Sequence, residues 1–526
     1  MFEKIKSVFK PLPFSIVAII VTGFLLRLYR LVELFHFTYD EEIIAFVGKR
    51  MWVNHHIPLI GGVTPLHVHL APYFYWFSGL TLGLFNLNPL GWGIVAALIA
   101  AATMIVLWFS AKALFNKTIA SFSVIFYAFS FYQNLFDRHY WGLAFNGLLS
   151  LLTIYCLKQI IDRKYRFTYL LSLVLAFGFH TDPSTIVLII ASIIVFFLKV
   201  RLPQKQFLMT LIIFGLSFVP LIAFDVRHNF VNISGINQYI SEIKSQKPGV
   251  IHDTPISTLL FVPRALSRTL FVNKSPDLAQ EYSYCPQYAV SRINQSNPLA
   301  QIFVLLVFSI SLIAFFRTKD QQQKNSFFLL LVPIISVYVG ISSYGLLLKG
   351  DLFDHYLSTL FPLFYVLFSF VLYQLLAKQK YILWLIVLGF VTLNLLQLQN
   401  VKHRFGFYDK EQAVRWAITQ VNNQPFSLDV IGNCFRYNGY RYLFYLFGDE
   451  PEKSYVDANF THLYDQPPAG EQPKTLVVIA NPSDFEDSDY FEEYDHYEEK
   501  TIARKSFGAI EVLIVDNSNL DFLGKF

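Results

Sequence analysis

Long apolar runs, separated by short polar segments, make up most of the first 400 residues of the chain. A helix needs about 20 apolar residues to cross a bilayer, so runs near that length predict membrane spans. Twelve such runs lie near 14–33, 68–87, 91–111, 118–136, 140–160, 167–181, 183–198, 206–224, 299–316, 326–347, 356–376 and 381–398. This pattern predicts an α-helical polytopic membrane protein.

Lysine and arginine gather at particular ends of these runs and indicate how the chain threads the membrane. The clusters lie near residues 4–10, 112–117, 158–166, 199–205, 317–324 and 378–380. Cytoplasmic loops are enriched in these residues, and all six clusters fall on that side only if the run 68–87 does not span. That run is aromatic from Tyr73 to Phe77, and aromatic side chains favour the membrane interface.

The threading therefore predicts about eleven transmembrane helices in an integral plasma (inner) membrane protein with a cytoplasmic amino terminus. Residues 34–89 become one outer loop, in which 41–53 and 68–87 form juxtamembrane helices. The first apolar run, 14–33, has no small-residue cleavage site behind it, so we expect it to remain as an anchor.

The chain divides into a transmembrane domain, residues 1–399, and a mostly polar domain, residues 400–526. Within the first domain, 225–298 form a second outer loop, and Arg264 and Arg268 are expected at its surface. Short helical and strand patterns alternate in 400–526, which predicts a soluble α/β domain. An odd number of spans places this carboxyl-terminal domain outside the membrane.

Composition agrees with this division. The chain is 54% hydrophobic and 15% charged, whereas soluble domains are about 25% charged. The net charge of +5 is small, and no nucleic-acid partner is expected. Cys156, Cys285 and Cys434 do not make a disulfide framework, although Cys285 and Cys434 both fall outside the membrane, which leaves one bridge between them as an alternative.

Ionisable side chains collect at the outer ends of the predicted spans and are nearly absent from the span interiors. The outer groups are Asp40, Glu41, Glu42, Asp137, Arg138, His139, His180, Asp182, Asp225, Arg227, His228, Lys349, Asp351, Asp354 and His355. A coupled transporter usually places such groups near the bilayer midplane, so this distribution favours chemistry at the outer surface. Cationic side chains there would hold the phosphate of a lipid-linked sugar, and a carboxylate would accept a proton from the incoming nucleophile.

Five short segments occur in an order that is typical of a known family. They are Tyr39-Asp40-Glu41, Ala71-Pro72-Tyr73-Phe74-Tyr75-Trp76, Asp137-Arg138-His139-Tyr140-Trp141, Phe224-Asp225-Val226-Arg227-His228 and His355-Tyr356 followed by Phe361-Pro362. In this order they resemble the C-type integral-membrane glycosyltransferases, in the branch of protein O-mannosyltransferases and lipid A aminoarabinose transferases. The resemblance covers about residues 10–400, and the Trp-Trp-Asp-Tyr-Gly hallmark of oligosaccharyltransferases is absent.

The resemblance implies an inverting transferase that takes a hexose or pentose from a dolichyl- or undecaprenyl-phosphate-sugar donor. It assigns Asp40 as the general base and Glu41 as the acidic neighbour that positions the acceptor. Contacts to the donor phosphate are expected from Arg138, Arg227, His228, His355 and Tyr356. A further group of candidates at the same face comprises His139, His180, Asp182 and Lys349.

The expected partners are a polyprenyl-phosphate-sugar donor, membrane lipid and an acceptor that is a glycan, a lipid or a protein. No metal site or cofactor is predicted, but a divalent metal stays open because Asp and Glu are also metal ligands. Two other interpretations remain: a transporter or flippase of lipid-linked sugars or polysaccharide, and a sensory protein built around 400–526. The structural alternative for Asp40 is a helix N-cap, and Glu42 is expected to be a carboxylate of the first helical turn.

Overall fold

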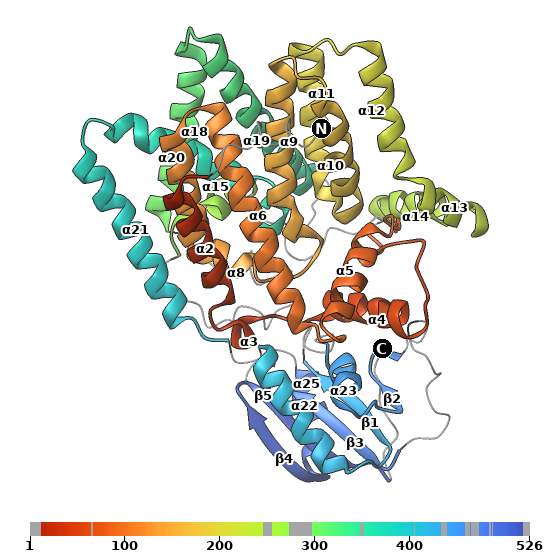
Figure 1. Ribbon diagram of the computed structural model, residues 1–526. Helices are drawn as coiled ribbons and strands as arrows, with labels where there is room; N and C mark the ends of the chain where they lie inside the picture. The colour runs from red at the N-terminus through yellow and green to blue at the C-terminus, as the bar shows by residue number, and fades with distance from the viewer. Residues whose placement is uncertain are drawn as a thin grey trace.

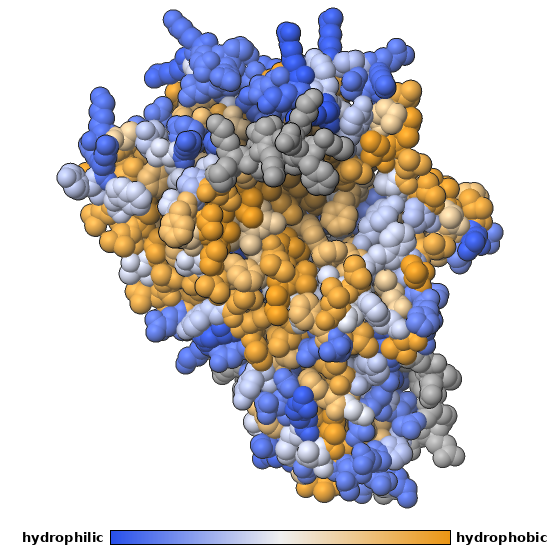
Figure 2. Space-filling model, viewed as in Figure 1, coloured by the Kyte–Doolittle hydropathy of each residue, from blue (hydrophilic) through white to orange (hydrophobic). Residues whose placement is uncertain are grey.

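The computed structural model shows a large helical bundle joined to a smaller unit that contains a sheet, with short helices between them (Figure 1). It describes residues 12–64, 67–245, 255–272, 297–347, 352–403, 406–432, 439–457, 463, 473–482, 485 and 488–518. On the face that Figure 2 shows, apolar side chains cover the middle of the bundle, and polar ones gather at its far end and over the sheet unit. The protein is a polytopic membrane protein with a soluble carboxyl-terminal domain, as predicted.

The bundle helices follow the predicted spans along the chain. Among the described residues, five helical stretches are long and apolar enough to cross a membrane: α6 (Leu90–Leu114), η1 with α9 (Gly142–Phe145 and Asn146–Ile161), α18 (Pro298–Arg317), α19 (Gln321–Leu347) and α21 (Lys380–Asn400). Five shorter apolar stretches in the same part of the chain are α2 (Phe14–Leu28), α7 (Lys117–Phe129), α10 (Phe167–Thr181), η2 with α11 (Pro183–Thr185 and Ile186–Lys199) and α20 (Phe361–Leu376). Together with one bent pair of helices, they correspond in position to the eleven predicted spans.

The predicted span 206–224 is not one straight helix. It is divided into α12 (Gln204–Leu216) and α13 (Val219–Arg227), which are bent by 45° at the break. Pro220, in the first turn of α13, has no backbone N–H to continue the helical hydrogen bonds, and its ring disfavours a helical turn before it. The hydroxyl of Tyr73 donates to a backbone carbonyl at the break at 2.8 Å.

The first predicted outer loop contains two helices that pack on each other between the bundle and the sheet unit (Figure 1). α4 (Tyr39–Val53) and α5 (Tyr73–Leu84) approach closely at two glycines, and a Cβ on Gly48 would lie 3.3 Å from the Gly79 Cα. The indole N–H of Trp52 donates to the Gly79 carbonyl at 2.6 Å. With 12 residues, α5 is only about 18 Å long, which is too short to span. Three further short helices on this side of the bundle are α3 (Leu31–Leu34), α8 (Phe131–Phe136) and η3 (Asp354–Leu357).

The predicted outer loop 225–298 is not a surface segment throughout. Its described part forms α14 (Val231–Ser245) and α15 (Pro255–Leu270), and α15 packs against α18, α19 and α20. Apolar side chains at helical spacing along α15 face the core of the bundle. Arg268 is consequently buried, which corrects its expected place at the loop surface.

In its described residues, the carboxyl-terminal unit has a five-stranded sheet with helices on both faces. The strand order is β2 (Lys453–Ser454), β1 (Phe426–Ile431), β3 (Thr475–Ala480), β5 (Ile510–Asp516) and β4 (Thr501–Phe507). β1 is parallel to β2 and β3, whereas β5 is antiparallel to β3 and β4, and Val430 lies opposite Ile479. The two faces are covered by α22 (Phe407–Val421) with α23 (Tyr440–Phe447), and by α25 (Ser488–Glu498). All of β1 is buried because both of its faces are covered.

The connection between the two units is short. α21 ends at Asn400 and α22 begins at Phe407. The backbone N–H of Phe407 donates to the carbonyl of Phe35 at 3.0 Å, so the sheet unit begins beside the segment that leads into α4. The predicted division between residues 399 and 400 falls in this region and stays a prediction.

Candidate active site

The acidic segment forms the first turn of α4, and each of its carboxylates has different surroundings. Thr38 is the N-cap residue, and Glu41 completes a capping box by accepting from the Thr38 backbone N–H at 3.0 Å and from its hydroxyl at 2.6 Å. The other carboxylate oxygen of Glu41 lies 2.5 Å from Nε2 of His139. Burial acts to raise the pKa of Glu41, but His139 and these hydrogen bonds lower it below its ordinary value.

Glu42 is also fully buried, but it faces the sheet unit. Its Oε1 accepts from the backbone N–H of Tyr442, in the first turn of α23, at 2.9 Å. Burial raises the pKa of Glu42 to about 7, opposed by this hydrogen bond and by the charges of Lys410 and Arg441. Glu42 therefore joins the two units and does not reach solvent.

Asp40 is the exposed carboxylate of the three, whereas Glu41 and Glu42 are both 0% exposed. Solvent reaches its side chain, yet enough protein surrounds it that desolvation raises the pKa of Asp40 to about 6. The charge of Glu41 adds to this increase, and His139 opposes it. Burial, and next the charge of Asp40, raise the pKa of the nearby Tyr75 hydroxyl on α5. An accessible carboxylate with a pKa near the operating pH is suited to accept a proton.

A row of aromatic rings connects the acidic segment with η3. His139 stacks on Trp141 with ring centroids 4.1 Å apart, and Trp141 meets His355 edge-on at 5.3 Å. On the other side, the His36 ring lies 5.4 Å from His139 and 5.7 Å from His403. The structure thus brings the predicted candidates His139 and His355 toward the acidic segment, together with two histidines that the sequence did not single out.

The ends of this row are uncharged at neutral pH. Burial lowers the pKa of His355 and of His403 to about 3, and it lowers the pKa of His36 well below its ordinary value. Electrostatic interaction with His139 acts in the same direction on His355, and interaction with Lys410 does so on His403. His355 was expected to neutralise the donor phosphate; as a neutral imidazole it offers a hydrogen bond and no charge.

Arg138, for which the sequence predicts a contact with the donor phosphate, contacts the end of α2. Its guanidinium is buried and donates to the carbonyls of Arg27 at 3.0 Å, Leu26 at 2.6 Å and Tyr29 at 2.9 Å. These carbonyls lie at the carboxyl end of α2, where helical donors are missing. Arg138 therefore caps α2.

The neighbouring Asp137 also has a structural role. Its Oδ2 accepts from Nη2 of Arg27 at 2.7 Å, and both side chains are buried. Its Oδ1 accepts from the Gln133 amide at 2.6 Å. The three consecutive side chains from Asp137 to His139 project in three directions, and of these only His139 contacts the acidic segment.

Two other predicted phosphate contacts, Arg227 and His228, are exposed at the end of α13, at the edge of the bundle (Figure 1). His228 stacks on Phe224 with ring centroids 4.1 Å apart. In the described part of the chain, neither side chain contacts the acidic segment.

Tyr356, in contrast, packs edge-on against His355, with ring centroids 4.7 Å apart. The candidate Lys349 lies outside the described residues, as do the two cysteines of the alternative bridge.

His180 and Asp182 link neighbouring elements. Nε2 of His180 lies 3.1 Å from the Ser217 hydroxyl at the break between α12 and α13. Asp182 begins η2 by accepting from the Ser184 backbone N–H at 2.6 Å, and its other oxygen lies 3.4 Å from the Asn146 amide. Their partners explain how the α10–α11 hairpin is held against the rest of the bundle.

A buried ion pair that the sequence analysis missed lies beside His355. Nη1 of Arg268 donates to Oδ2 of Asp354 at 2.7 Å, and the two side chains are 6% and 4% exposed. Because Asp354 directly precedes His355, α15 carries a guanidinium to the end of the aromatic row. The available signal was the spacing of Arg264 and Arg268, four residues apart among apolar residues, which puts both on one side of a helix.

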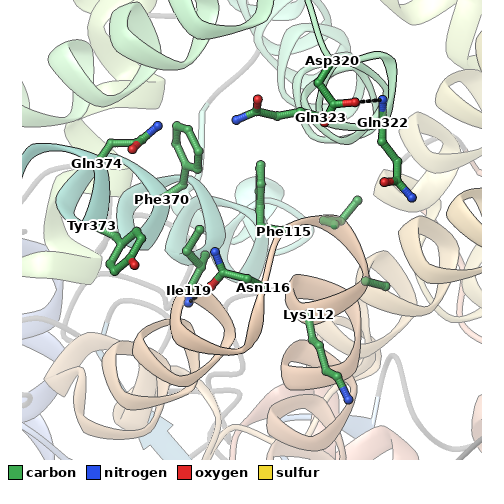
Figure 3. A pocket seen from close by; sticks show the side chains of 12 residues that line it. Lys112, Phe115, Asn116, Ile119, Asp320, Gln322, Gln323, Phe370, Tyr373 and Gln374 are labelled. Carbon is green, nitrogen blue, oxygen red and sulfur yellow. Dashed lines mark hydrogen bonds between the residues drawn. The ribbon is translucent and has the colours of Figure 1, made fainter. Parts of the chain in front are cut away.

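A polar pocket of about 440 Å³ lies at the carboxyl end of α6. It is enclosed by the α6–α7 turn, the start of α19 and the end of α20 (Figure 3). Two of the polar side chains that line the pocket hold the starts of helices. Asn116 caps α7 by accepting from the Ile119 N–H at 3.0 Å, and Asp320 accepts from the Gln322 N–H at 3.0 Å. None of the predicted site residues lines this pocket, and no function is assigned to it.

The described ranges also bear on metal binding. No group of three or more His, Cys, Asp or Glu side chains there is arranged to hold a metal ion. The divalent metal that the sequence leaves open therefore has no candidate ligand set in this part of the chain.

Comparisons with known proteins bear on the family. Residues 69–224 match the sequence profile of the dolichyl-phosphate-mannose-protein mannosyltransferase family. No curated protein matches the sequence. Among solved structures, ArnT from Cupriavidus metallidurans bound to undecaprenyl phosphate is 12% identical, with 95% of this chain and 97% of that chain covered and a TM-score of 0.54.

A second solved structure is the oligosaccharyltransferase from Archaeoglobus fulgidus in complex with zinc and sulfate. It is 10% identical, 88% of this chain and 67% of that chain are covered, and the TM-score is 0.45. The predicted resemblance to C-type glycosyltransferases is confirmed, by sequence over residues 69–224 and by the fold shared with ArnT.

Proposed function

We propose that the protein is an integral-membrane glycosyltransferase that moves a sugar from a polyprenyl-phosphate-linked donor to an acceptor at the outer face of the plasma membrane. The family that residues 69–224 match is described by a dolichyl-phosphate-mannose donor, and ArnT was solved with undecaprenyl phosphate. The observation that carries the proposal is Asp40, an exposed carboxylate with a pKa of about 6 beside two buried ones.

In this mechanism, ionised Asp40 accepts the proton of the acceptor hydroxyl or amine as that group attacks C1 of the sugar. The bond from C1 to the phosphate oxygen breaks, and its electron pair leaves with the polyprenyl phosphate. Attack on the face opposite the phosphate inverts the anomeric centre. We assign Glu41 a different role from the predicted positioning of the acceptor: it holds the first turn of α4 through Thr38 and His139.

The departing phosphate gains negative charge and needs hydrogen-bond donors. We assign this role to His355 and Tyr356, at the far end of the aromatic row. His355 donates as a neutral imidazole, and the ion pair of Arg268 with Asp354 lies directly behind it. Arg138 is left out of this role because its Nε and Nη2 donate to carbonyls at the end of α2 and its guanidinium is buried.

The proposed orientation rests on the basic clusters. In the described bundle they lie at the ends of α6, α9, α11, α18 and α20 that point away from the sheet unit (Figure 1). Since cytoplasmic loops are enriched in Lys and Arg, the amino terminus is cytoplasmic and the carboxyl-terminal domain is extracytoplasmic. The acceptor, whether glycan, lipid or protein, then approaches Asp40 from outside.

Replacement of Asp40 tests the proposal. The assay uses proteoliposomes, synthetic polyprenyl-phosphate-linked sugars beginning with mannose, and a membrane extract as the source of acceptor. We expect Asp40→Asn to lower kcat for polyprenyl phosphate release by about 10²–10⁴-fold, the usual contribution of a general base. Glu33→Gln removes a neighbouring exposed carboxylate and should retain full activity.

Two outcomes would contradict the proposal. Wild-type transfer by Asp40→Asn rules out the assigned base. Movement of a lipid-linked sugar across sealed vesicles without release of polyprenyl phosphate supports the transporter interpretation instead.

A further inference from the structure

The position of Asp40 depends on the backbone of the first turn of α4. Among the residues that the structure describes, no side chain makes a hydrogen bond with the Asp40 carboxylate. Thr38 and Glu41 fix this turn from the bundle side, through the capping box and His139. The other side of the turn rests on the carboxyl-terminal domain.

Lys410 makes the first of these contacts. Its side chain is fully buried, and Nζ donates to the backbone carbonyl of Phe37 at 2.6 Å. Lys410 lies on α22, 373 residues further along the chain than Phe37. A buried ammonium is costly unless it is hydrogen-bonded and close to negative charge. Burial lowers the pKa of Lys410 to about 7, and the charges of Glu41 and Glu42 oppose this decrease.

The start of α23 makes the second and third contacts. Gly439 precedes this helix with φ +82°, and a Cβ on it would lie 2.5 Å from the Phe37 ring and 3.2 Å from the Phe37 carbonyl oxygen. Three residues on, the backbone N–H of Tyr442 donates to Glu42 at 2.9 Å. The domain thus contacts the chain on both sides of Asp40, three residues before it at Phe37 and two residues after it at Glu42.

Contacts further along α4 hold the domain in the same position. The ammonium of Lys49 lies 3.7 Å from the centre of the Tyr445 ring. The hydroxyl of Tyr442 donates to the Leu87 carbonyl at 2.8 Å, and its ring packs edge-on against Phe46 at 5.3 Å. α23 is therefore attached to the whole first outer loop and not to one residue of it.

We infer that the carboxyl-terminal domain is part of the catalytic unit, with Lys410, Gly439 and Glu42 as positioning residues that fix the turn bearing Asp40. The inference rests on the proposed function, since it assigns a role to the domain in the same reaction. Displacing the domain would leave Asp40 chemically intact but misplaced. A displacement of about 1 Å at a catalytic group is enough to cost up to about 100-fold in rate.

Two variants on the domain side test the inference in the full-length protein. Lys410→Met keeps an unbranched side chain one atom shorter but removes the donor to Phe37, and Gly439→Ala places a methyl group against the Phe37 ring. For both we expect kcat to fall by about tenfold or more, while KM for polyprenyl-phosphate-mannose stays within about twofold. Arg415→Met is the matched control, because Arg415 lies on the same helix, α22, but is exposed, and it should retain activity.

Hydrogen exchange shows whether an effect is local. In both variants the amides of residues 38–44 should exchange faster, while β3 and β5 stay protected as in the wild type. A purely structural role would instead lower protection in the sheet as well, which would overturn the inference.

Glu42 gives a second, milder pair of variants. Glu42→Gln keeps Oε1 as an acceptor for the Tyr442 N–H and should retain most of kcat, whereas Glu42→Ala removes the acceptor and should lose about tenfold. Equal activity of Gln and Ala variants counts against positioning. If Lys410→Met, Gly439→Ala and Glu42→Ala all retain kcat while Asp40→Asn is inactive, the inference fails and the proposed function stands. An active Asp40→Asn protein removes the proposed function itself.

Discussion

One turn of helix sends three adjacent carboxylates in three directions, because successive side chains on an α-helix are rotated by about 100°. Glu41 turns toward His139 in the bundle, and Glu42 turns toward the backbone of Tyr442 in the sheet unit. Asp40 is left accessible between them. Chemically similar neighbours in the sequence thus become an accessible carboxylate, part of a helix cap and a contact between domains.

The pKa of Asp40 gives an expected pH dependence. A raised pKa means that Asp40 keeps its proton up to about pH 6, so the base is present above that pH and is lost below it. We expect kcat/KM to fall by about tenfold for each pH unit below 6. Glu42→Gln removes the other carboxylate of the acidic segment that has a raised pKa, and it should leave this fall of kcat/KM at low pH in place. If kcat/KM no longer falls below pH 6 in that variant, the titration belongs to Glu42.

Arg138 should affect stability more than donor binding. Arg138→Ala removes the donors to three carbonyls at the end of α2, and we expect a loss of about 3 kcal/mol in the free energy of unfolding. Unfolding in a detergent titration measures this loss, and KM for the donor should stay within about twofold. Arg166→Ala, an exposed site at the start of α10, is the control. A raised donor KM with unchanged stability would restore the phosphate role that the sequence predicts.

At the scale of elements, α4 is placed by its close approach to α5. The two helices touch where both carry glycine, at Gly48 and Gly79, and this brings Tyr75 of α5 near Asp40. Small residues allow helix backbones to approach in this way.

A bulkier residue at this crossing should separate the helices. A Cβ on Gly48 would already lie 2.8 Å from the Leu82 side chain and 3.3 Å from the Gly79 backbone. Gly48→Val should therefore lower kcat by about tenfold or more, since α4 carries the base, and it should lower Tm as well. Gly389→Val in α21 is a matched control, because nothing lies within 4 Å of a Cβ there. Equal losses in both variants would point to helix propensity and not to the crossing.

The sequence predicted those helices whose position follows from apolar length and charge. It did not predict the direction in which each side chain points. Apolar length and basic clusters located the bundle helices and showed that the run containing α5 does not span. α15 was missed because its polar residues hide an apolar face, and Pro220 was overlooked inside an apolar run. Asp137 and Arg138 were assigned to the site because sequence order shows which residues share a turn, not where each one points.

At the scale of the whole molecule, the acidic segment lies between two units that are distant in the sequence. The residues that surround it come from the first outer loop, from the turn that holds His139, and from α22 and α23. Lys410, Gly439 and His403 could not be identified in advance, because their role depends on the docking of a domain that lies outside the family resemblance.

Membrane topology gives a test at this scale. With Cys285 and Cys434 replaced by Ser, single cysteines are placed at two exposed sites, Glu498 on α25 and Arg163 after α9. We expect a membrane-impermeant maleimide to label residue 498 in intact cells and to label residue 163 only after permeabilisation. The buried Cys156 should stay unlabelled. The reverse pattern would invert the proposed orientation.

The contacts of Lys410 with Phe37 and of Tyr442 with Glu42 also set an order in time. Both join residues that leave the ribosome early to residues that leave it some 370–400 positions later. While the intervening helices are inserted, the first turn of α4 lacks its contacts with Lys410 and Tyr442. The first turn of α4 therefore reaches its final position only when the carboxyl-terminal domain has been made and has folded against the first outer loop. In an unfinished chain, Asp40, the proposed base, is not yet fixed in place.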